Sequence, residues 1–169
     1  EVDHLNKVSD LRLLPGAAKA LAMLNRSGFL VVVISNQGAV AKGMLTAEGL
    51  EEINTELLRR LARQGAKIDA MYHCPHHPEG MIEKYRMKCL CRKPSPGIIL
   101  EAAKSMSIDL KKSFFIGDTT SDILAGERAG LITVLVKTGY GGHDKKHEVK
   151  PDVVARNLAD AVEYIKSNG

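Results

Sequence analysis

The stretch "FLVVVISN", from Phe29 to Asn36, decides the fold of this 169-residue sequence. It is continuous, apolar and rich in β-branched residues, which is typical of a parallel strand that is covered on both faces. On its N-terminal side, Pro15 opens a helical pattern that Gly28 ends. On its C-terminal side, Thr46 can cap a helix that runs to about Gln64.

The alternation of strands and helices continues along the rest of the chain. The expected strands are residues 68–74, 113–118, 132–139 and 151–155, and the expected helices begin at Ser95-Pro96, at about Ser121 and at Asn157. This order predicts an α/β fold with a Rossmann-like parallel sheet and helices on both faces. Because no repeat or linker divides the pattern, we expect a single domain over residues 1–169.

The composition excludes several classes of protein. No apolar run is long enough to span a bilayer, and the first ten residues are too polar for a signal peptide. The net charge of +4 is spread along the chain and aromatic residues make up only 4%, so we expect no nucleic-acid partner. Three clustered cysteines do not form a secreted disulfide framework. We therefore expect a cytoplasmic monomer with reduced thiols and no membrane partner.

All three cysteines lie in "CPHHPEGMIEKYRMKCLCRKPSPG", residues 74–97. Two close pairs of candidate ligands are joined by a short loop, as tetrahedral zinc requires: Cys74 with His76, and Cys89 with Cys91. Such a sulfur-rich, closed set predicts a structural zinc site. The neighbouring His73 and His77 are alternative nitrogen ligands. Buried free cysteines and an RNA-binding zinc knuckle are the alternatives to a zinc-bound loop.

Polar residues follow the strands at the edge where parallel sheets bind ligands. Ser35, Asn36 and Gln37 end one strand, Asp118 ends another, and Lys93 stands beside the start of a helix. Hydroxyl, backbone N–H and ammonium groups suit a phosphate, and a carboxylate suits Mg²⁺.

Two glycine-rich segments have simpler interpretations. Residues 38–43 have the glycine spacing of a P-loop but lack its Lys-Ser/Thr, so we expect a mobile flap. Residues 139–152 are expected to form a solvated loop, and contact of this loop with substrate is the alternative.

Three segments, in this order, resemble the haloacid-dehalogenase-like phosphatases, and among them the bacterial D-glycero-D-manno-heptose 1,7-bisphosphate 7-phosphatases. They are "VVVISNQGAVAKGMLT" (31–46), "CPHHP…CLCRKPSPG" (74–97) and "FFIGDTTSDILAGERAG" (114–130). The resemblance implies a structural zinc and a catalytic Mg²⁺. It also implies hydrolysis of a phosphorylated sugar at its 7-phosphate, in the carbohydrate metabolism that supplies lipopolysaccharide precursors.

The resemblance also assigns roles to individual residues. Ser35 is the phosphate-binding hydroxyl of the family's second motif, Lys93 the lysine of its third motif and Asp118 the Mg²⁺ ligand of its fourth motif. Asn36, Gln37 and Arg92 are expected to contact the sugar phosphate. The zinc ligands implied by the resemblance are Cys74, His76, Cys89 and Cys91. Thr119 departs from the family pattern, which often has a basic residue at this position.

The first motif of the family has no counterpart in the sequence. That motif, a strand followed by Asp-x-Asp-Gly, supplies the nucleophile and the general acid, and the 169 residues contain no Asp-x-Asp. We expect the first strand to be missing and the chain as given to be inactive. The alternatives are a histidinol-phosphate phosphatase, which typically has a shorter zinc loop, and a non-catalytic protein that binds phosphosugars or metal.

Overall fold

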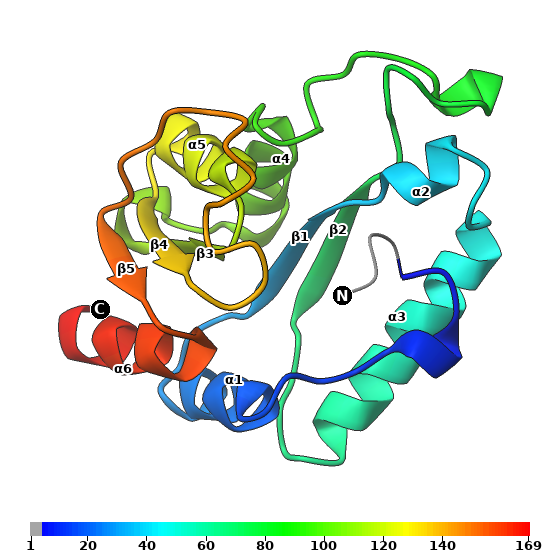
Figure 1. Ribbon diagram of the computed structural model, residues 1–169. Helices are drawn as coiled ribbons and strands as arrows, with labels where there is room; N and C mark the ends of the chain where they lie inside the picture. Colours follow the sequence, from blue (N-terminus) through cyan, green and yellow to red (C-terminus); the bar gives the residue numbers. More distant parts are fainter. Residues whose placement is uncertain (1–4) are drawn as a thin grey trace. The chain divides into compact units, whose positions relative to one another are not determined.

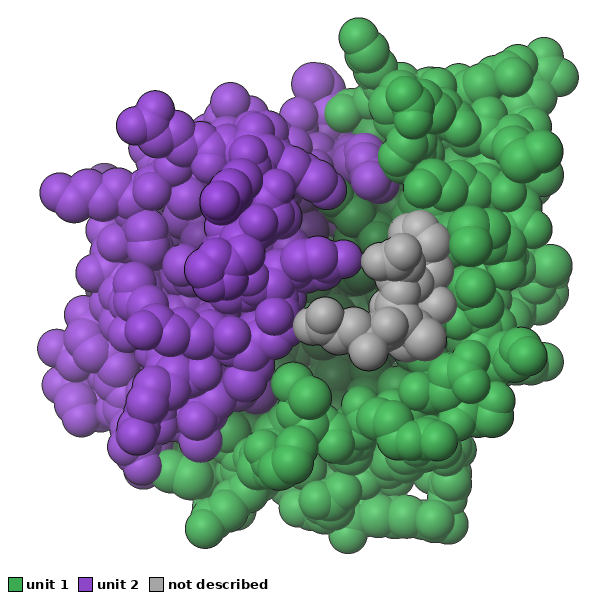
Figure 2. Space-filling model, viewed as in Figure 1, with its two compact units in different colours: residues 1–89 green, residues 90–169 purple. Residues whose placement is uncertain are grey.

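The structure is a computed structural model that describes residues 5–169, and it forms two compact units. Unit 1 comprises residues 1–89 and unit 2 comprises residues 90–169 (Figure 2). Each contains its own parallel sheet, so the predicted α/β class with parallel strands is confirmed, with its described strands in two sheets. The single domain over residues 1–169 stays a prediction.

Unit 1 is built on two parallel strands, β1 (Val32–Asn36) and β2 (Ala70–Cys74), paired from Val32 with Ala70 to Asn36 with Cys74. The strand β1 begins later than the apolar run from Phe29. Before it, Val31 and Asp69 exchange hydrogen bonds: the N–H of Val31 donates to Oδ2 of Asp69, and the N–H of Asp69 donates to the carbonyl of Val31, each at 2.8 Å. All five residues of β1 are half-buried, which differs from the expected strand covered on both faces.

The helices of unit 1 pack through small and aliphatic side chains. Helix α1 (Ala17–Arg26) buries Ala18 and Ala22 against Leu61 and Ala66, at the end of α3 (Ala47–Ala62). The predicted cap of α3 is confirmed, since Oγ1 of Thr46 accepts from the N–H of Gly49. The remaining elements are the short helix α2 (Gly38–Ala41) and the 3-10 helices η1 (Val8–Asp10) and η2 (Glu83–Tyr85). The α2 turn is buried at all four positions, so the expected flap is a packed turn instead.

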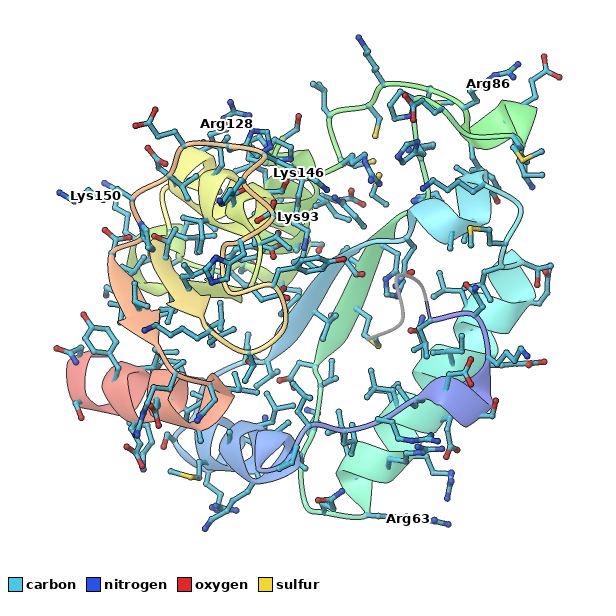
Figure 3. All side chains as sticks on the ribbon, in the orientation of Figure 1. Arg63, Arg86, Lys93, Arg128, Lys146 and Lys150 are labelled. Carbon is cyan, nitrogen blue, oxygen red and sulfur yellow. The ribbon has the colours of Figure 1, made fainter. Side chains whose placement is uncertain are left out.

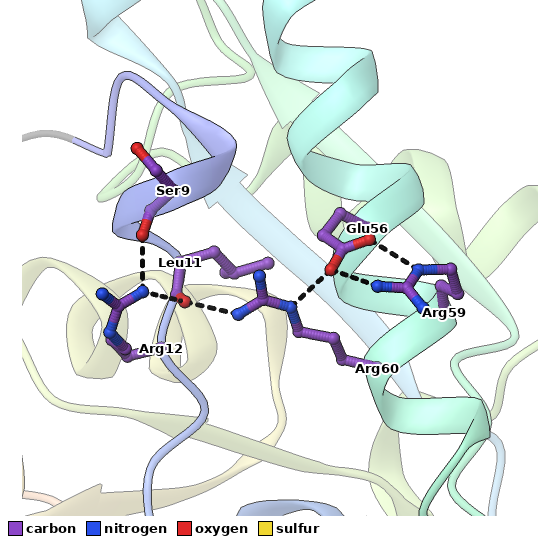
Figure 4. A network of polar contacts seen from close by, with 6 residues as sticks. All are labelled: Ser9, Leu11, Arg12, Glu56, Arg59 and Arg60. Carbon is purple, nitrogen blue, oxygen red and sulfur yellow. Dashed lines mark hydrogen bonds and ion pairs between the residues drawn. The ribbon is translucent and has the colours of Figure 1, made fainter.

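An arginine on α3 holds the N-terminal segment of unit 1 (Figure 4). Nη1 of Arg60 donates to the carbonyl of Leu11 at 2.6 Å, while its Nε donates to Glu56 at 2.6 Å. Arg59 also donates twice to Glu56. Hydrogen bonds from Arg59 and Arg60 lower the pKa of Glu56 to about 2. The carboxylate therefore stays ionised and fixes the orientation of the guanidinium that reaches Leu11.

Unit 2 contains the parallel strands β3 (Phe114–Gly117), β4 (Ile132–Val136) and β5 (Val153–Ala155), in the order β3-β4-β5. Its helices are α4 (Gly97–Met106), α5 (Thr120–Ala129) and α6 (Leu158–Asn168), with the 3-10 helix η3 at Leu110–Lys112. The predicted cap of α6 is confirmed, because Oδ1 of Asn157 accepts from the N–H of Asp160.

In unit 2, helices α5 and α6 lie beside the sheet (Figure 1), and the side chains of successive strand residues point to opposite faces of it. Phe115 and Thr133 lie against Gly126 of α5, while their neighbours Phe114 and Val134 belong to the core with Ala161 of α6. Because successive side chains of a strand point to opposite faces, α5 and α6 cover opposite sides of this sheet. The prediction of helices on both faces is thus confirmed for unit 2. Among residues 5–169, no helix is both long and apolar enough to cross a bilayer.

Candidate functional site

The four predicted zinc ligands form one cluster at the end of β2. One ligand atom from each of Cys74, His76, Cys89 and Cys91 lies within 4.8 Å of all the others. Sγ of the buried Cys74 is 3.5 Å from Sγ of Cys89 and 3.8 Å from Nδ1 of His76, and Cys91 follows Cys89 on the same loop. Three thiols and an imidazole at this separation match the donor set and the closed geometry of a structural zinc site. The donor set therefore fits the metal that the sequence predicts.

The loop between the two ligand pairs is held by backbone hydrogen bonds. The N–H of His77 donates to the carbonyl of Tyr85 at 3.1 Å, and the N–H of Ile82 donates to the carbonyl of Ala41 at 2.9 Å. Gly80 lies so close to Ala41 that a side chain at this position would collide with it. The loop is thereby anchored on the α2 turn, which directs Cys89 back toward Cys74.

The two competing histidines lie outside this cluster. Nδ1 of His77 accepts from the N–H of Glu79 at 3.1 Å, in a local turn. Nε2 of His73 lies 2.9 Å from Nδ2 of Asn54, and within residues 5–169 its buried Nδ1 has no hydrogen-bond partner. Burial lowers the pKa of His73, so its ring is neutral at pH 7. Of the three histidines, the structure brings His76 to the thiols.

In unit 1, the predicted phosphate-binding residues lie at the C-terminal end of β1. Ser35 and Asn36 are its last residues, and Gln37 connects it to α2. The N–H of Gln37 donates to the carbonyl of Cys74 at 2.8 Å, and its side-chain Nε2 lies 3.1 Å from Oγ of Ser35. Gln37 thus links the Ser35 hydroxyl to the last residue of β2, from which the zinc loop departs.

In unit 2, the predicted lysine forms a shielded ion pair. Nζ of Lys93 is 2.6 Å from Oδ1 of Asp122, and their side chains are only 12% and 9% exposed. Oδ2 of Asp122 accepts from the N–H and the hydroxyl of Thr119, at 3.1 and 2.7 Å, in a capping box that begins α5. Burial raises the pKa of Asp122, but the charge of Lys93 and the hydrogen bonds outweigh it, so the net pKa is lowered. Asp122 is therefore an anion that positions the ammonium of Lys93.

The turn that carries Lys93 is closed by its own backbone. The N–H of Gly97 donates to the carbonyl of Leu90 at 3.0 Å, and the N–H of Ser95 donates to the carbonyl of Arg92 at 2.9 Å. Any side chain at Gly97 would collide with the backbone at Leu90. Nη1 of Arg128 on α5 also donates to the carbonyl of Pro94. This turn places Arg92 and Lys93 ahead of α4, as the sequence predicts.

Asp118 follows directly on β3 and is fixed by the loop after β4. Its Oδ2 accepts from the N–H of Tyr140 at 2.9 Å, and its carbonyl accepts from the N–H of Gly142 at 2.8 Å. Gly139 approaches the carboxylate so closely that a Cβ would overlap it. Within residues 5–169, no ammonium or guanidinium pairs with Asp118. An uncompensated carboxylate at the end of a parallel strand fits a hard divalent cation.

Sequence analysis missed the contribution of the loop after β4. Much of the loop is exposed, as expected of a solvated loop, but Tyr140 and Gly142 also donate to Asp118. Asp144 accepts from both the N–H and the hydroxyl of Thr120 at 2.8 Å. The glycines at 139, 141 and 142, all with positive φ, were the available signal of a tightly folded loop. The grouping of Ser35 with Lys93 and Asp118 in one site stays a prediction, since these residues belong to different units.

Comparison with known proteins agrees with these features. Residues 90–161 match the model of the HAD-hydrolase-like family. The chain is 36% identical over 168 residues to the D-glycero-beta-D-manno-heptose-1,7-bisphosphate 7-phosphatase of Haemophilus ducreyi, covering 97% of this chain and 91% of that relative. It is 35% identical over 159 residues to the corresponding alpha enzyme of Photorhabdus laumondii, covering 94% of this chain and 85% of that relative.

A solved structure extends this likeness to the fold. The D,D-heptose 1,7-bisphosphate phosphatase from B. bronchiseptica, complexed with magnesium and phosphate, aligns with a TM-score of 0.89 at 29% identity. The alignment covers 100% of this chain and 92% of that one. Together with its sequence relatives, this places the chain in the haloacid-dehalogenase-like hydrolases, in the family of the D-glycero-D-manno-heptose-1,7-bisphosphate 7-phosphatases.

Proposed function

We propose that the protein takes part in the hydrolysis of a sugar phosphate monoester, the 7-phosphate of D-glycero-D-manno-heptose 1,7-bisphosphate. The observation that carries the proposal is the shielded Lys93–Asp122 pair in the same unit as the carboxylate of Asp118, which has no ion-pair partner among residues 5–169. A positioned ammonium and a cation-binding carboxylate are the groups that phosphoryl transfer requires, because its transition state spreads negative charge over three oxygens. The family supports the choice of substrate class.

Each residue has a distinct role in this proposal. Lys93, held by Asp122, neutralises phosphoryl oxygens, and the hydroxyl of Ser35 donates to them. Asp118 holds Mg²⁺, which when bound neutralises charge on the phosphoryl group. The nucleophile implied by the family resemblance is an aspartate, and the 169 residues offer no Asp-x-Asp to supply it. We therefore assign the nucleophile to an Asp-x-Asp-Gly segment outside these 169 residues.

Substrate preference is assigned to Arg92, with Asn36 and Gln37 as further contacts. A guanidinium binds phosphate through two parallel hydrogen bonds, so Arg92 suits the phosphate of the bisphosphate that is not hydrolysed. We leave the anomer unassigned, because the chain is 36% identical to a relative named for the beta anomer and 35% identical to one named for the alpha anomer.

Zinc and the cellular setting complete the proposal. Zinc at Cys74, His76, Cys89 and Cys91 holds the loop after β2 and takes no part in the chemistry, because four protein ligands leave no position for water. The three clustered cysteines, which form no disulfide within residues 5–169, suit the reducing cytoplasm, where we place the protein as a monomer.

The test compares two forms of the protein in the presence of Mg²⁺. One is the 169-residue chain, and the other carries a strand ending in Asp-x-Asp-Gly before Glu1. Phosphate release from heptose 1,7-bisphosphate is expected from the extended form alone. Turnover by the 169-residue chain at a rate near that of the extended form would place the nucleophile within these residues and overturn the assignment.

A further inference from the structure

A pocket of about 510 Å³ lies in unit 2, between the start of α5 and the loop that joins β4 to β5. Its ionisable and imidazole-bearing lining residues are His143, Lys145, Lys146, His147 and Glu148. The lining therefore carries two ammonium groups against one carboxylate, and two imidazoles add hydrogen-bonding capacity. This excess of positive charge and of donors suits an anion.

The wall of the pocket is fixed by hydrogen bonds that do not use its lysine side chains. Asp144 does not line the pocket; its carboxylate accepts from the N–H and hydroxyl of Thr120, both at 2.8 Å. The N–H of His147 donates to the same hydroxyl at 3.2 Å, and Thr120 is only 4% exposed. Lys145, between these anchors, has a φ of 48°, which L-residues rarely adopt. The loop is thus held in a defined shape, with Asp144 turned to α5 rather than to the lysines.

The pocket adjoins the segment that carries Asp118. Gly142 lines the pocket, and its N–H donates to the carbonyl of Asp118 at 2.8 Å. Thr120, another lining residue, follows Asp118 by two positions. A phosphorylated molecule held at Asp118 would therefore have the basic pocket next to it in the same unit.

We propose that this pocket binds a phosphate group of a phosphorylated small molecule. Ammonium groups and hydrogen-bond donors on a pre-shaped loop favour a compact dianion, which accepts several charge-assisted hydrogen bonds at once. The phosphate has two sources: the second phosphate of a bisphosphate substrate, as a contact additional to the one assigned to Arg92, or a separate phosphate ion. Only the first source rests on the proposed function.

Inorganic phosphate is the first probe, titrated into the ¹⁵N-labelled 169-residue chain without added divalent metal. Shifts are expected at the amides of residues 141–148. The double variant Lys145→Ala/Lys146→Ala should weaken the phosphate affinity read from these amides about tenfold at low ionic strength, because it removes two exposed positive charges. Lys150→Ala is the matched control: this exposed lysine does not line the pocket and points away from the rest of unit 2 (Figure 3), so a change within twofold is expected.

Equal losses of phosphate affinity in the double variant and in Lys150→Ala would mean that general surface charge attracts the phosphate, and would overturn the proposal. So would an absence of shifts at residues 141–148.

Heptose 1,7-bisphosphate and heptose 7-phosphate, which lacks the 1-phosphate, then distinguish the two sources of the bound phosphate. If the pocket holds the second phosphate of the substrate, the bisphosphate displaces inorganic phosphate from these amides and the double variant weakens bisphosphate binding alone. If it holds a separate ion, phosphate stays bound beside the sugar. Failure of the extended form to hydrolyse the bisphosphate would refute the proposed function without touching the phosphate titration.

Discussion

Unit 1 organises its functional loop around the thiols of Cys74 and Cys89 and the imidazole of His76, with Cys91 two residues beyond the last residue of the unit. Unit 2 organises its functional segments with an ion pair and hydrogen bonds. In unit 1, Sγ of Cys74 and Sγ of Cys89 lie 3.5 Å apart at the two ends of the loop, so a metal bound to both would hold these ends together. In unit 2, Lys93 is held by Asp122 and Asp118 is held by backbone N–H groups. The difference predicts that metal removal and charge removal affect different halves of the chain.

The largest expected effect is removal of zinc. Protein purified without added metal should contain about one zinc per chain, and Cys89→Ser should lose it. Binding to such sites contributes on the order of 10 kcal/mol in small peptides and less where a scaffold orders the loop. Hydrogen exchange should accelerate in residues 75–92 and stay slow in β3 and β4. Full zinc retention by Cys89→Ser, or equal loosening of both units, would contradict the comparison.

The next largest effect is expected for Lys93→Ala in the extended form. Turnover should fall about 10²–10³-fold, because the charge that Lys93 balances is greatest in the transition state. Removal of the ammonium also leaves the buried Asp122 unpaired, so stability falls as well. The pair Lys93→Met/Asp122→Asn separates the two effects: it should recover stability while turnover stays low. Lys104→Ala, at an exposed position of α4, is the control.

The dependence of stability on pH tests the ion pair in the 169-residue chain. The pKa of Asp122 is lowered in the folded state from its usual 3.8. Its stabilising contribution is therefore fully present above pH 3.8 and is lost as the pH falls through the folded value. Thermal melts between pH 7 and pH 2.5 should show a smaller acid-induced decrease in Tm for Asp122→Asn than for wild type. Glu101→Gln, which removes an exposed charge in the same unit, should follow the wild type.

A smaller effect is expected for Arg92→Ala in the extended form. KM for the bisphosphate should rise about tenfold with kcat nearly unchanged, because a contact distant from the reacting phosphate contributes equally to ground and transition states. The ratio of kcat/KM for the bisphosphate to kcat/KM for the monophosphate should therefore fall. A fall in kcat as large as that of Lys93→Ala would assign Arg92 to the chemistry.

The smallest effect distinguishes two glycines of unit 2. Gly139 and Gly130 both have positive φ, of 71° and 78°, so alanine costs each about 1 kcal/mol in backbone strain. Only at Gly139 would the added Cβ meet the carboxylate of Asp118, since Gly130 has nothing within 4 Å. Calorimetry with Mg²⁺ and phosphate should show a several-fold loss of Mg²⁺ affinity for Gly139→Ala alone. The same loss in Gly130→Ala would mean that strain, and not Asp118, is responsible.

Local signals in the sequence predicted most elements and the zinc cluster. Thr46 and Asn157 cap their helices as expected, because a side-chain oxygen that accepts from the N–H three residues later needs no tertiary contact. The ligands of the cluster can be predicted from the sequence because Cys74 ends a strand and the pair Cys89 and Cys91 follows after a short loop.

The tertiary structure alone decided the contacts that depend on distant segments. The start of β1 at Val32 follows from hydrogen bonds between Val31 and Asp69, which no pattern around Phe29 reveals. The pairing of Lys93 with Asp122 and the anchoring of the loop after β4 by Asp144 have the same origin. Hydrophobic periodicity and helix capping depend on residues a few positions apart, so they can be predicted from the sequence. The partners of buried charges depend on packing, which brings together groups that are 20 or more residues apart along the chain.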